Sequence, residues 1–73
     1  MSEEVRPTRV RLAEALRAEI AANPGLTELP HRREIAGQYG LAQATVAQVL
    51  RALAAEGLIE AQADGRWTVA GRL

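Results

Sequence analysis

Residues 30–57 of the chain read PHRREIAGQYGLAQATVAQVLRALAAEG. The first third of this stretch predicts a helix over residues 32–39, which Pro30 introduces. Gly40 ends that helix, because glycine readily takes the left-handed backbone conformation that follows a helix. Leu41 and the residue after it then form a tight turn.

The rest of the stretch predicts a longer helix over residues 43–56, ended by Gly57. Its apolar residues recur at the spacing of one helix face, and they are Val46, Val49, Leu50 and Leu53. Two short helices joined by a tight turn that contains glycine form a helix-turn-helix unit, whose second helix enters the major groove in DNA-binding proteins.

The residues before this unit predict one more helix. Leu12, Leu16 and Ile20 form a stripe from about Pro7 onward, with Ala13 beside it, and residues 23–25 (Asn-Pro-Gly) end the helix. Residues 1–6 are interpreted as a flexible tail. Residues 26–30 are expected to form a brief strand or an extended linker.

The residues after this unit predict a β-hairpin. Strands are expected over 58–62 and 66–70, joined by the turn Ala63-Asp64-Gly65. The sequence therefore predicts one domain over residues 7–73, mainly α with a small β-hairpin. Its expected architecture is a winged helix-turn-helix with three helices and a two- or three-stranded wing.

The composition narrows the class of protein. Of the 73 residues, 48% are hydrophobic and only 3% aromatic, so the core must be aliphatic. The absence of cysteine excludes disulfides and Cys-based zinc sites. The formal net charge is zero, which counts against purely electrostatic binding of nucleic acid, but every basic residue is arginine. With no signal peptide and no membrane-spanning run, we expect a cytoplasmic, nucleoid-associated protein with no membrane partner.

Several short motifs together resemble the DNA-binding domain of GntR-type bacterial repressors. The similar segments span about Arg9 to Val69, and they are 29–36 (LPHRREIA), 39–41 (YGL), 44–46 (ATV) and 50–59 (LRALAAEGLI). The resemblance implies a winged helix that binds double-stranded DNA, usually as a homodimer on a palindromic site. The family normally adds a larger C-terminal domain that senses a metabolite, and no such small-molecule effector domain is expected in this chain, which is either an excised domain or a small stand-alone regulator.

The chain departs from the family pattern where the family usually contacts DNA. The family has Ser or Thr and then Arg where this chain has Ala42 and Gln43, and a second Arg where it has Ala47. Arg33 matches the arginine of the family's Pro-Ser-Glu-Arg-Glu segment, and Thr45 matches its threonine. The fold is therefore expected to carry over, whereas the operator sequence is not.

Ten residues are the candidate DNA contacts: Arg32, Arg33, Gln43, Ala44, Thr45, Ala47, Gln48, Arg51, Gly65 and Arg66. Gln43 and Gln48 can each form a bidentate contact with adenine, or be ordinary solvated residues. Ala44 and Ala47 either pack on a thymine methyl group or simply allow close approach.

The arginines and Thr45 point to the phosphate backbone. Arg32 and Arg33 stand at a helix N-terminus, where positive charge opposes the helix dipole unless a phosphate binds there. Thr45 either donates to a phosphate or caps its own helix. Arg51 either joins the DNA face or forms a surface ion pair.

The hairpin turn has both a DNA-binding and a structural interpretation, and structural roles are expected for Trp67, Tyr39 and His31. The Gly65-Arg66 turn either enters a minor groove or meets a phosphate, or is a solvated turn. Trp67 is expected to pack the wing onto the helices rather than stack on a partner. Tyr39 is expected to be partly buried, and His31 to start a helix, although histidine is a poor cap.

No constellation for catalysis, cofactor binding or metal binding is found, so an enzyme is not expected. Three functions stay open: a sequence-specific DNA-binding domain in transcription, the DNA-reading module of a plasmid partition, transfer or recombination protein, and a protein-interaction module that does not bind DNA. Winged helices serve all the DNA-binding functions, so the fold alone does not choose among those. The zero net charge and the departures at Gln43 and Ala47 motivate the third alternative.

Overall fold

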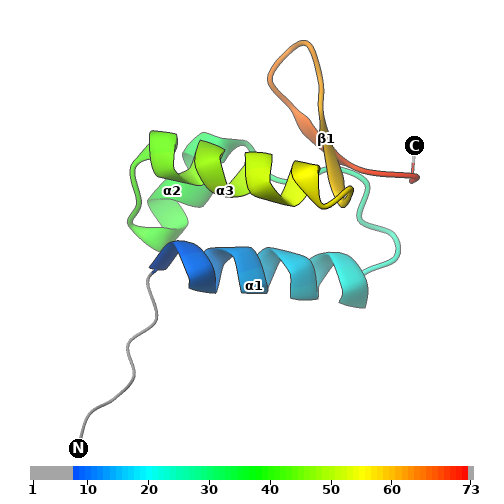
Figure 1. Cartoon of the computed structure of the whole chain (residues 1–73), viewed down its shortest axis with the longest axis horizontal. Coiled ribbons are helices and arrows are strands. Elements are labelled where there is room, and N and C mark those ends of the chain that lie inside the picture. The colour runs from blue at the N-terminus through cyan, green and yellow to red at the C-terminus, as the bar shows by residue number, and fades with distance from the viewer. Residues whose placement is uncertain (1–7, 73) are drawn as a thin grey trace, which may run out of the picture.

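The computed structural model describes residues 8–72, and the predicted tail and Pro7 lie outside them. The elements, in chain order, are α1 (Thr8–Ala22), α2 (Arg32–Tyr39), α3 (Gln43–Ala55), β1 (Ile59–Ala61) and β2 (Trp67–Val69). α1 lies along one side of α3, and the hairpin rises on the side away from α1 (Figure 1). The predicted winged helix-turn-helix is confirmed.

The turn between α2 and α3 forms as the sequence predicts. Gly40 follows α2 with φ 68° and ψ 34°, and its backbone N–H donates to the carbonyl of Ala36. At the other end of α2, His31 Nδ1 accepts the backbone N–H of Arg33 at 3.0 Å. His31 thus starts α2, as the sequence predicts, and its ring nitrogen takes the place of the hydroxyl or carboxylate acceptor of the better caps.

β1 and β2 form an antiparallel pair in which Ile59 lies opposite Val69. Both strands are shorter than predicted, and the loop between them bends at Gly65, whose φ is 91°. The expected strand before α2 is reduced to a single antiparallel bridge between Glu28 and Thr68. Pro30 explains its shortness, since proline has no N–H to continue the ladder.

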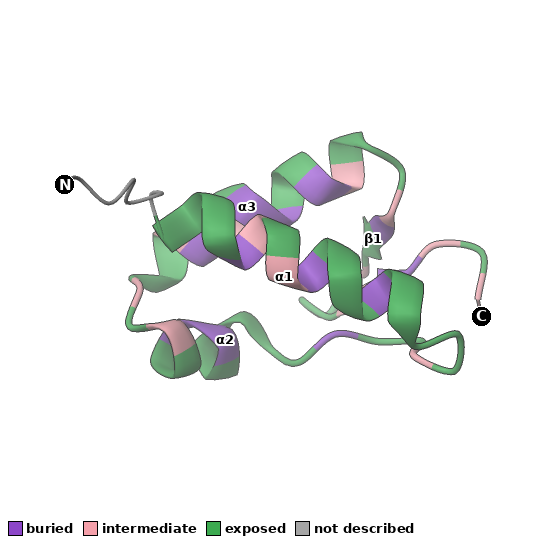
Figure 2. Ribbon diagram, turned by 90° about the horizontal axis from the view of Figure 1, so that it is seen from below, coloured by how far each residue is buried: buried purple, intermediate pink, exposed green. Residues whose placement is uncertain are grey.

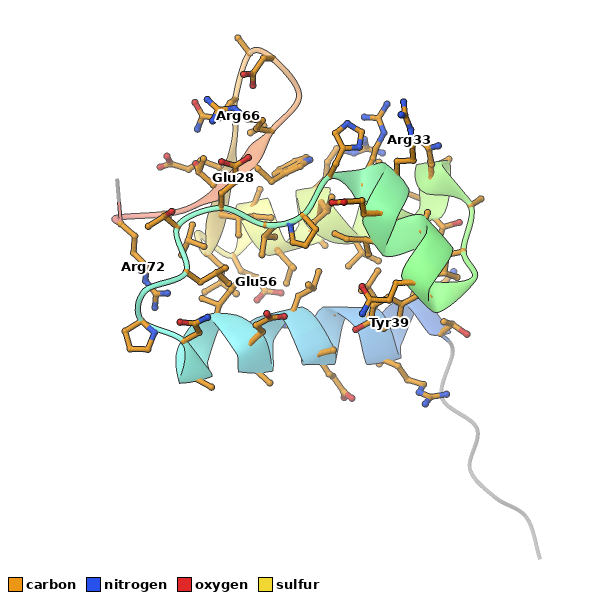
Figure 3. The ribbon with its side chains drawn as sticks, turned by 180° about the vertical axis from the view of Figure 1, so that it is seen from behind. Glu28, Arg33, Tyr39, Glu56, Arg66 and Arg72 are labelled. Atoms are coloured by element: carbon orange, nitrogen blue, oxygen red, sulfur yellow. The ribbon has the colours of Figure 1, made fainter. Side chains whose placement is uncertain are left out.

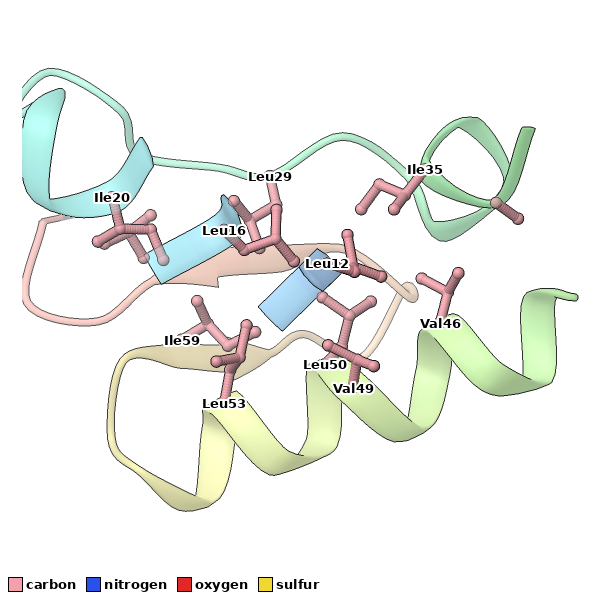
Figure 4. Close-up of a cluster of buried hydrophobic side chains, with 12 residues drawn as sticks. Leu12, Leu16, Ile20, Leu29, Ile35, Val46, Val49, Leu50, Leu53 and Ile59 are labelled. Atoms are coloured by element: carbon pink, nitrogen blue, oxygen red, sulfur yellow. The ribbon is translucent and has the colours of Figure 1, made fainter. Parts of the chain in front are cut away.

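The core is aliphatic and is shared by all three helices and the hairpin (Figure 4). Viewed from the α1 side, buried positions recur along α1 between exposed ones (Figure 2). The buried residues include every inward position predicted for the helices, and the whole set is Leu12, Leu16, Ile20, Leu29, Ile35, Ala36, Val46, Val49, Leu50, Leu53, Ile59 and Val69. Burial of each large aliphatic side chain stabilises the fold by about 1.5–3 kcal/mol.

Two arginine contacts fasten α1 to the rest of the domain. Arg17 Nε donates to Glu56 Oε1 at 3.0 Å, which joins α1 to the end of α3. This hydrogen bond from Arg17 lowers the pKa of the Glu56 carboxyl. At the C-terminal end of α1, Arg72 donates to the carbonyls of Ile20 at 3.1 Å and Asn23 at 2.9 Å. These contacts hold α1 against α3 and against the end of the hairpin segment.

Candidate DNA interface

One side of the molecule gathers the start of α2, the start of α3 and the hairpin. Arg33 on α2 and Arg66 on the hairpin extend on this side, and α1 forms the opposite side (Figure 3). The helix-turn-helix geometry places the two helix N-termini here, because the short turn at Gly40 returns the chain to the start of α3. We call this side the candidate face.

The first turn of α2 carries two exposed arginines with different surroundings. Arg32 Nε donates to Gln43 Oε1 at 3.4 Å, so this guanidinium is directed toward α3. The guanidinium of Arg33 has no hydrogen-bond or ion-pair partner among residues 8–72. Both positive charges stand near the positive end of the helix dipole, an arrangement that an anion would relieve.

α3 presents an exposed face at the positions the sequence predicted, with Gln43, Ala44, Gln48 and Arg51 exposed and Thr45 and Ala47 half-buried. Its N-cap, Ala42, supplies no side-chain hydrogen bond. The exposed face divides in two. Gln43, the first residue of α3, contacts Arg32 of α2, whereas Gln48 lies on the α1 side.

The α1 side of α3 is a shallow groove. Gln48 lines it with the α1 residues Arg9, Val10 and Ala13. The structure therefore separates Gln48 from Gln43, although the sequence gave both the same expected contact with adenine.

The hairpin presents a paired arginine rather than a free one. Arg66 Nε donates to Asp64 Oδ2 at 2.8 Å, and its Nη1 donates to Glu28 Oε1 at 3.3 Å. The backbone N–H and the guanidinium of Arg66 both lower the pKa of Asp64. The Arg66 side chain is still 53% exposed. Gly65 forms the bend at the tip, as predicted, and its contact with DNA stays a prediction.

Two of these contacts were missed by sequence reasoning. Arg32 and Gln43 are 11 residues apart, and Glu28 and Arg66 are 38 apart, so no local pattern links them.

Arg51 is exposed and forms no ion pair within the described part of the chain.

The aromatic residues lie where the sequence placed them. Trp67 and Tyr39 are half-buried and pack against the core. Trp67 thus packs the hairpin onto the core, whereas Tyr39, at the end of α2, lies on the α1 side, away from the candidate face (Figure 3).

Other classes of site find no support in the described residues. Within residues 8–72, no group of three His, Cys, Asp or Glu side chains lies close enough to hold a metal ion. No helix in this range is long and apolar enough to cross a membrane.

Comparisons with known proteins agree with this geometry. The sequence pattern of the bacterial regulatory proteins of the gntR family matches residues 8–69. The DNA-binding domain of AraR, solved in complex with the operator ORE1, superposes with a TM-score of 0.84 at 24% identity, over 96% of this chain and 88% of that one. The same domain with the operator ORR3 gives the same score and identity, over 96% and 87% of the two chains.

A third solved structure is YtrA from Sulfolobus acidocaldarius, a GntR-family transcription factor. It is similar at a TM-score of 0.80 and 27% identity, over 97% of this chain and 62% of that one, so the chain spans under two thirds of YtrA. A search of the curated proteins gives no match. The family pattern covers most of the chain, and the chain therefore belongs to the gntR family of bacterial regulatory proteins, as a winged helix DNA-binding domain.

Proposed function

We propose that the domain binds double-stranded DNA sequence-specifically in transcription regulation, with the start of α3 in the major groove. The observation that carries this proposal is Arg33. Its guanidinium has no partner in the described chain, and it extends on the same side as the hairpin. A cation so placed at a helix N-terminus is stabilised by a phosphate, which the neighbouring backbone N–H groups also attract.

The remaining candidates take separate roles in this arrangement. Phosphate contacts from Arg33, Thr45 and Arg51 set the position of the domain on the duplex, and side chains at the start of α3 read base edges. The hairpin, with Arg66, lies beside the backbone next to the groove. Ala44 and Ala47 present small side chains that allow close approach.

The biological setting follows from the family. AraR, solved with its operators, supports an operator-binding role for this domain. Two copies on a palindromic site would double the contacts, because a two-fold symmetric site presents the same half-site to each copy. The proposed role is binding rather than catalysis, in the cytoplasm at the nucleoid.

The first test is a titration of the labelled protein with a random-sequence duplex at low salt, followed by NMR. We expect shifts at the start of α2, along α3 from Gln43 and at the hairpin. Arg33→Ala should weaken binding to all duplexes similarly and lower the slope of log affinity against log salt by about 1.

Arg11→Ala is the matched control, since Arg11 is exposed and belongs to α1, the helix that forms the side opposite the candidate face. It should change affinity little. If the chain binds no duplex at low salt, or if its affinity does not depend on salt, the proposal is overturned and the protein-interaction alternative is favoured.

A further inference from the structure

We propose that Arg32 is a specificity-determining residue that reads guanine in the major groove, and that Gln43 holds its guanidinium in position. This inference rests on the proposed function. It assigns a base contact to a residue on α2, whereas base contacts of a helix-turn-helix are expected from the second helix.

The geometry joins the first residues of the two helices. Arg32 begins α2 and Gln43 begins α3, and both are exposed on the candidate face. The hydrogen bond from Arg32 Nε to Gln43 Oε1, at 3.4 Å, directs the arginine toward the N-terminus of α3. That end of the second helix is the part that reaches base edges in this class of fold.

The chemistry of the two side chains makes the pair complementary to guanine. An arginine has five N–H donors in a planar fork, and the contact with Gln43 uses only the one on Nε. The two terminal nitrogens are left to donate together to O6 and N7 of guanine, which is the commonest specific contact of arginine.

The same bond changes what Gln43 itself can read. A bidentate contact with adenine needs Oε1 to accept from N6 while Nε2 donates to N7. In the structure Oε1 already accepts from Arg32, so one of its two acceptor sites is occupied, whereas both Nε2 donors stay available. Those donors suit an acceptor on a base edge, and the expected preference of the pair moves from adenine to guanine.

Arg33 supplies a matched comparison on the same helix. It is the next residue and carries the same charge, but no described side chain holds its guanidinium. A free arginine can follow a phosphate, whereas a supported one presents a fixed fork. We therefore expect Arg32 to read a base and Arg33 to bind a phosphate.

The experiment is a selection of binding sites from a randomised duplex pool, with the purified chain and the variants Arg32→Ala, Arg32→Lys, Gln43→Ala and Arg33→Ala. The wild-type chain should select guanine at one position of each half-site. Arg32→Ala should reduce that preference about 5- to 150-fold. Arg32→Lys should keep affinity for random duplex but lose the preference, because an ammonium lacks the fork.

Gln43→Ala should weaken the preference at the same position, and the double variant should lose no more than Arg32→Ala alone, since both changes disrupt one unit. Arg33→Ala should weaken all sequences and keep the selected motif. Circular dichroism checks that each variant is folded, as expected for substitutions at exposed positions.

Each other outcome has a definite meaning. If the wild-type chain binds no duplex, the proposed function fails. If it selects a motif that Arg32→Ala leaves intact, the inference alone is overturned. If Arg32→Ala and Gln43→Ala alter different base positions additively, the supporting role of Gln43 is wrong.

Discussion

Ala42 precedes α3 in an extended conformation, with φ −70° and ψ 148°, and its carbonyl accepts the N–H groups of Thr45 and Val46. Its methyl group cannot accept a hydrogen bond from the first free N–H groups of the helix. The hydroxyl of Thr45 has no partner within the described residues, so it does not replace the cap. α3 therefore begins without the capping bond that His31 gives α2.

A side-chain hydroxyl at position 42, the N-cap of α3, should stabilise the domain. Ala42→Ser is expected to raise the free energy of unfolding by about 1 kcal/mol, because serine caps a helix far better than alanine. Urea denaturation followed by circular dichroism measures the change. Ala44→Ser is the control, since residue 44 lies inside the first turn and cannot act as the N-cap. Equal effects of the two substitutions would contradict the capping explanation.

At the scale of elements, the hairpin is tied to the segment before α2. Leu29 donates its N–H to the carbonyl of Trp67 at 2.9 Å, and Val69 donates to the carbonyl of Thr27 at 2.8 Å. The ion pair between Arg66 and Glu28 spans the same two segments. The hairpin is therefore held to residues 27–29, and the carboxylate of Glu28 stands beside the hairpin's only arginine.

Removal of that carboxylate should strengthen DNA binding. Glu28→Gln is expected to raise affinity for a duplex about 1.4- to 5-fold, because exposed ion pairs contribute about 0.2–1 kcal/mol and a phosphate would then compete for Arg66 with Asp64 alone. Fluorescence anisotropy with a labelled duplex, over a range of salt, measures the gain. Glu19→Gln on α1 removes the same charge elsewhere. A similar gain in that control would assign the effect to net charge.

For the whole molecule, the ion pair between Arg17 and Glu56 should make the free energy of unfolding depend on pH. The pKa of Glu56 is lowered in the folded chain, so its contribution is fully present above the pKa of the unfolded carboxyl and is lost as pH falls through the folded value. Glu56→Gln should therefore lower the melting temperature at about pH 7, and this deficit should shrink as pH falls below 4.5, the ordinary pKa of the carboxyl. Melting curves across this range measure it. A constant difference at every pH would show that the charge of Glu56 is not responsible.

Local features of the sequence predicted most of the fold. Gly40 and Gly57 marked helix ends, and the spacing of Val46, Val49, Leu50 and Leu53 marked the buried face, because backbone freedom and helix periodicity act between near neighbours. The candidate contacts on α3 could also be placed, since an inward face defines an outward one.

Contacts between distant segments could not be predicted. The carbonyls that Arg72 contacts lie about 50 residues away along the chain, and Glu28 meets Arg66 across the hairpin. Such bonds depend on tertiary packing, which sets distances that no local pattern contains. The support of Arg32 by Gln43 belongs to the same class, because it needs the angle between two helices.

The position of Trp67 has a practical consequence. It is the chain's single tryptophan, it lies in β2 next to Arg66, and it is half-buried against the core. Its indole is thus a natural fluorophore at the root of the wing, and a change in its emission on unfolding or on addition of a duplex would report on this part of the domain without any attached dye.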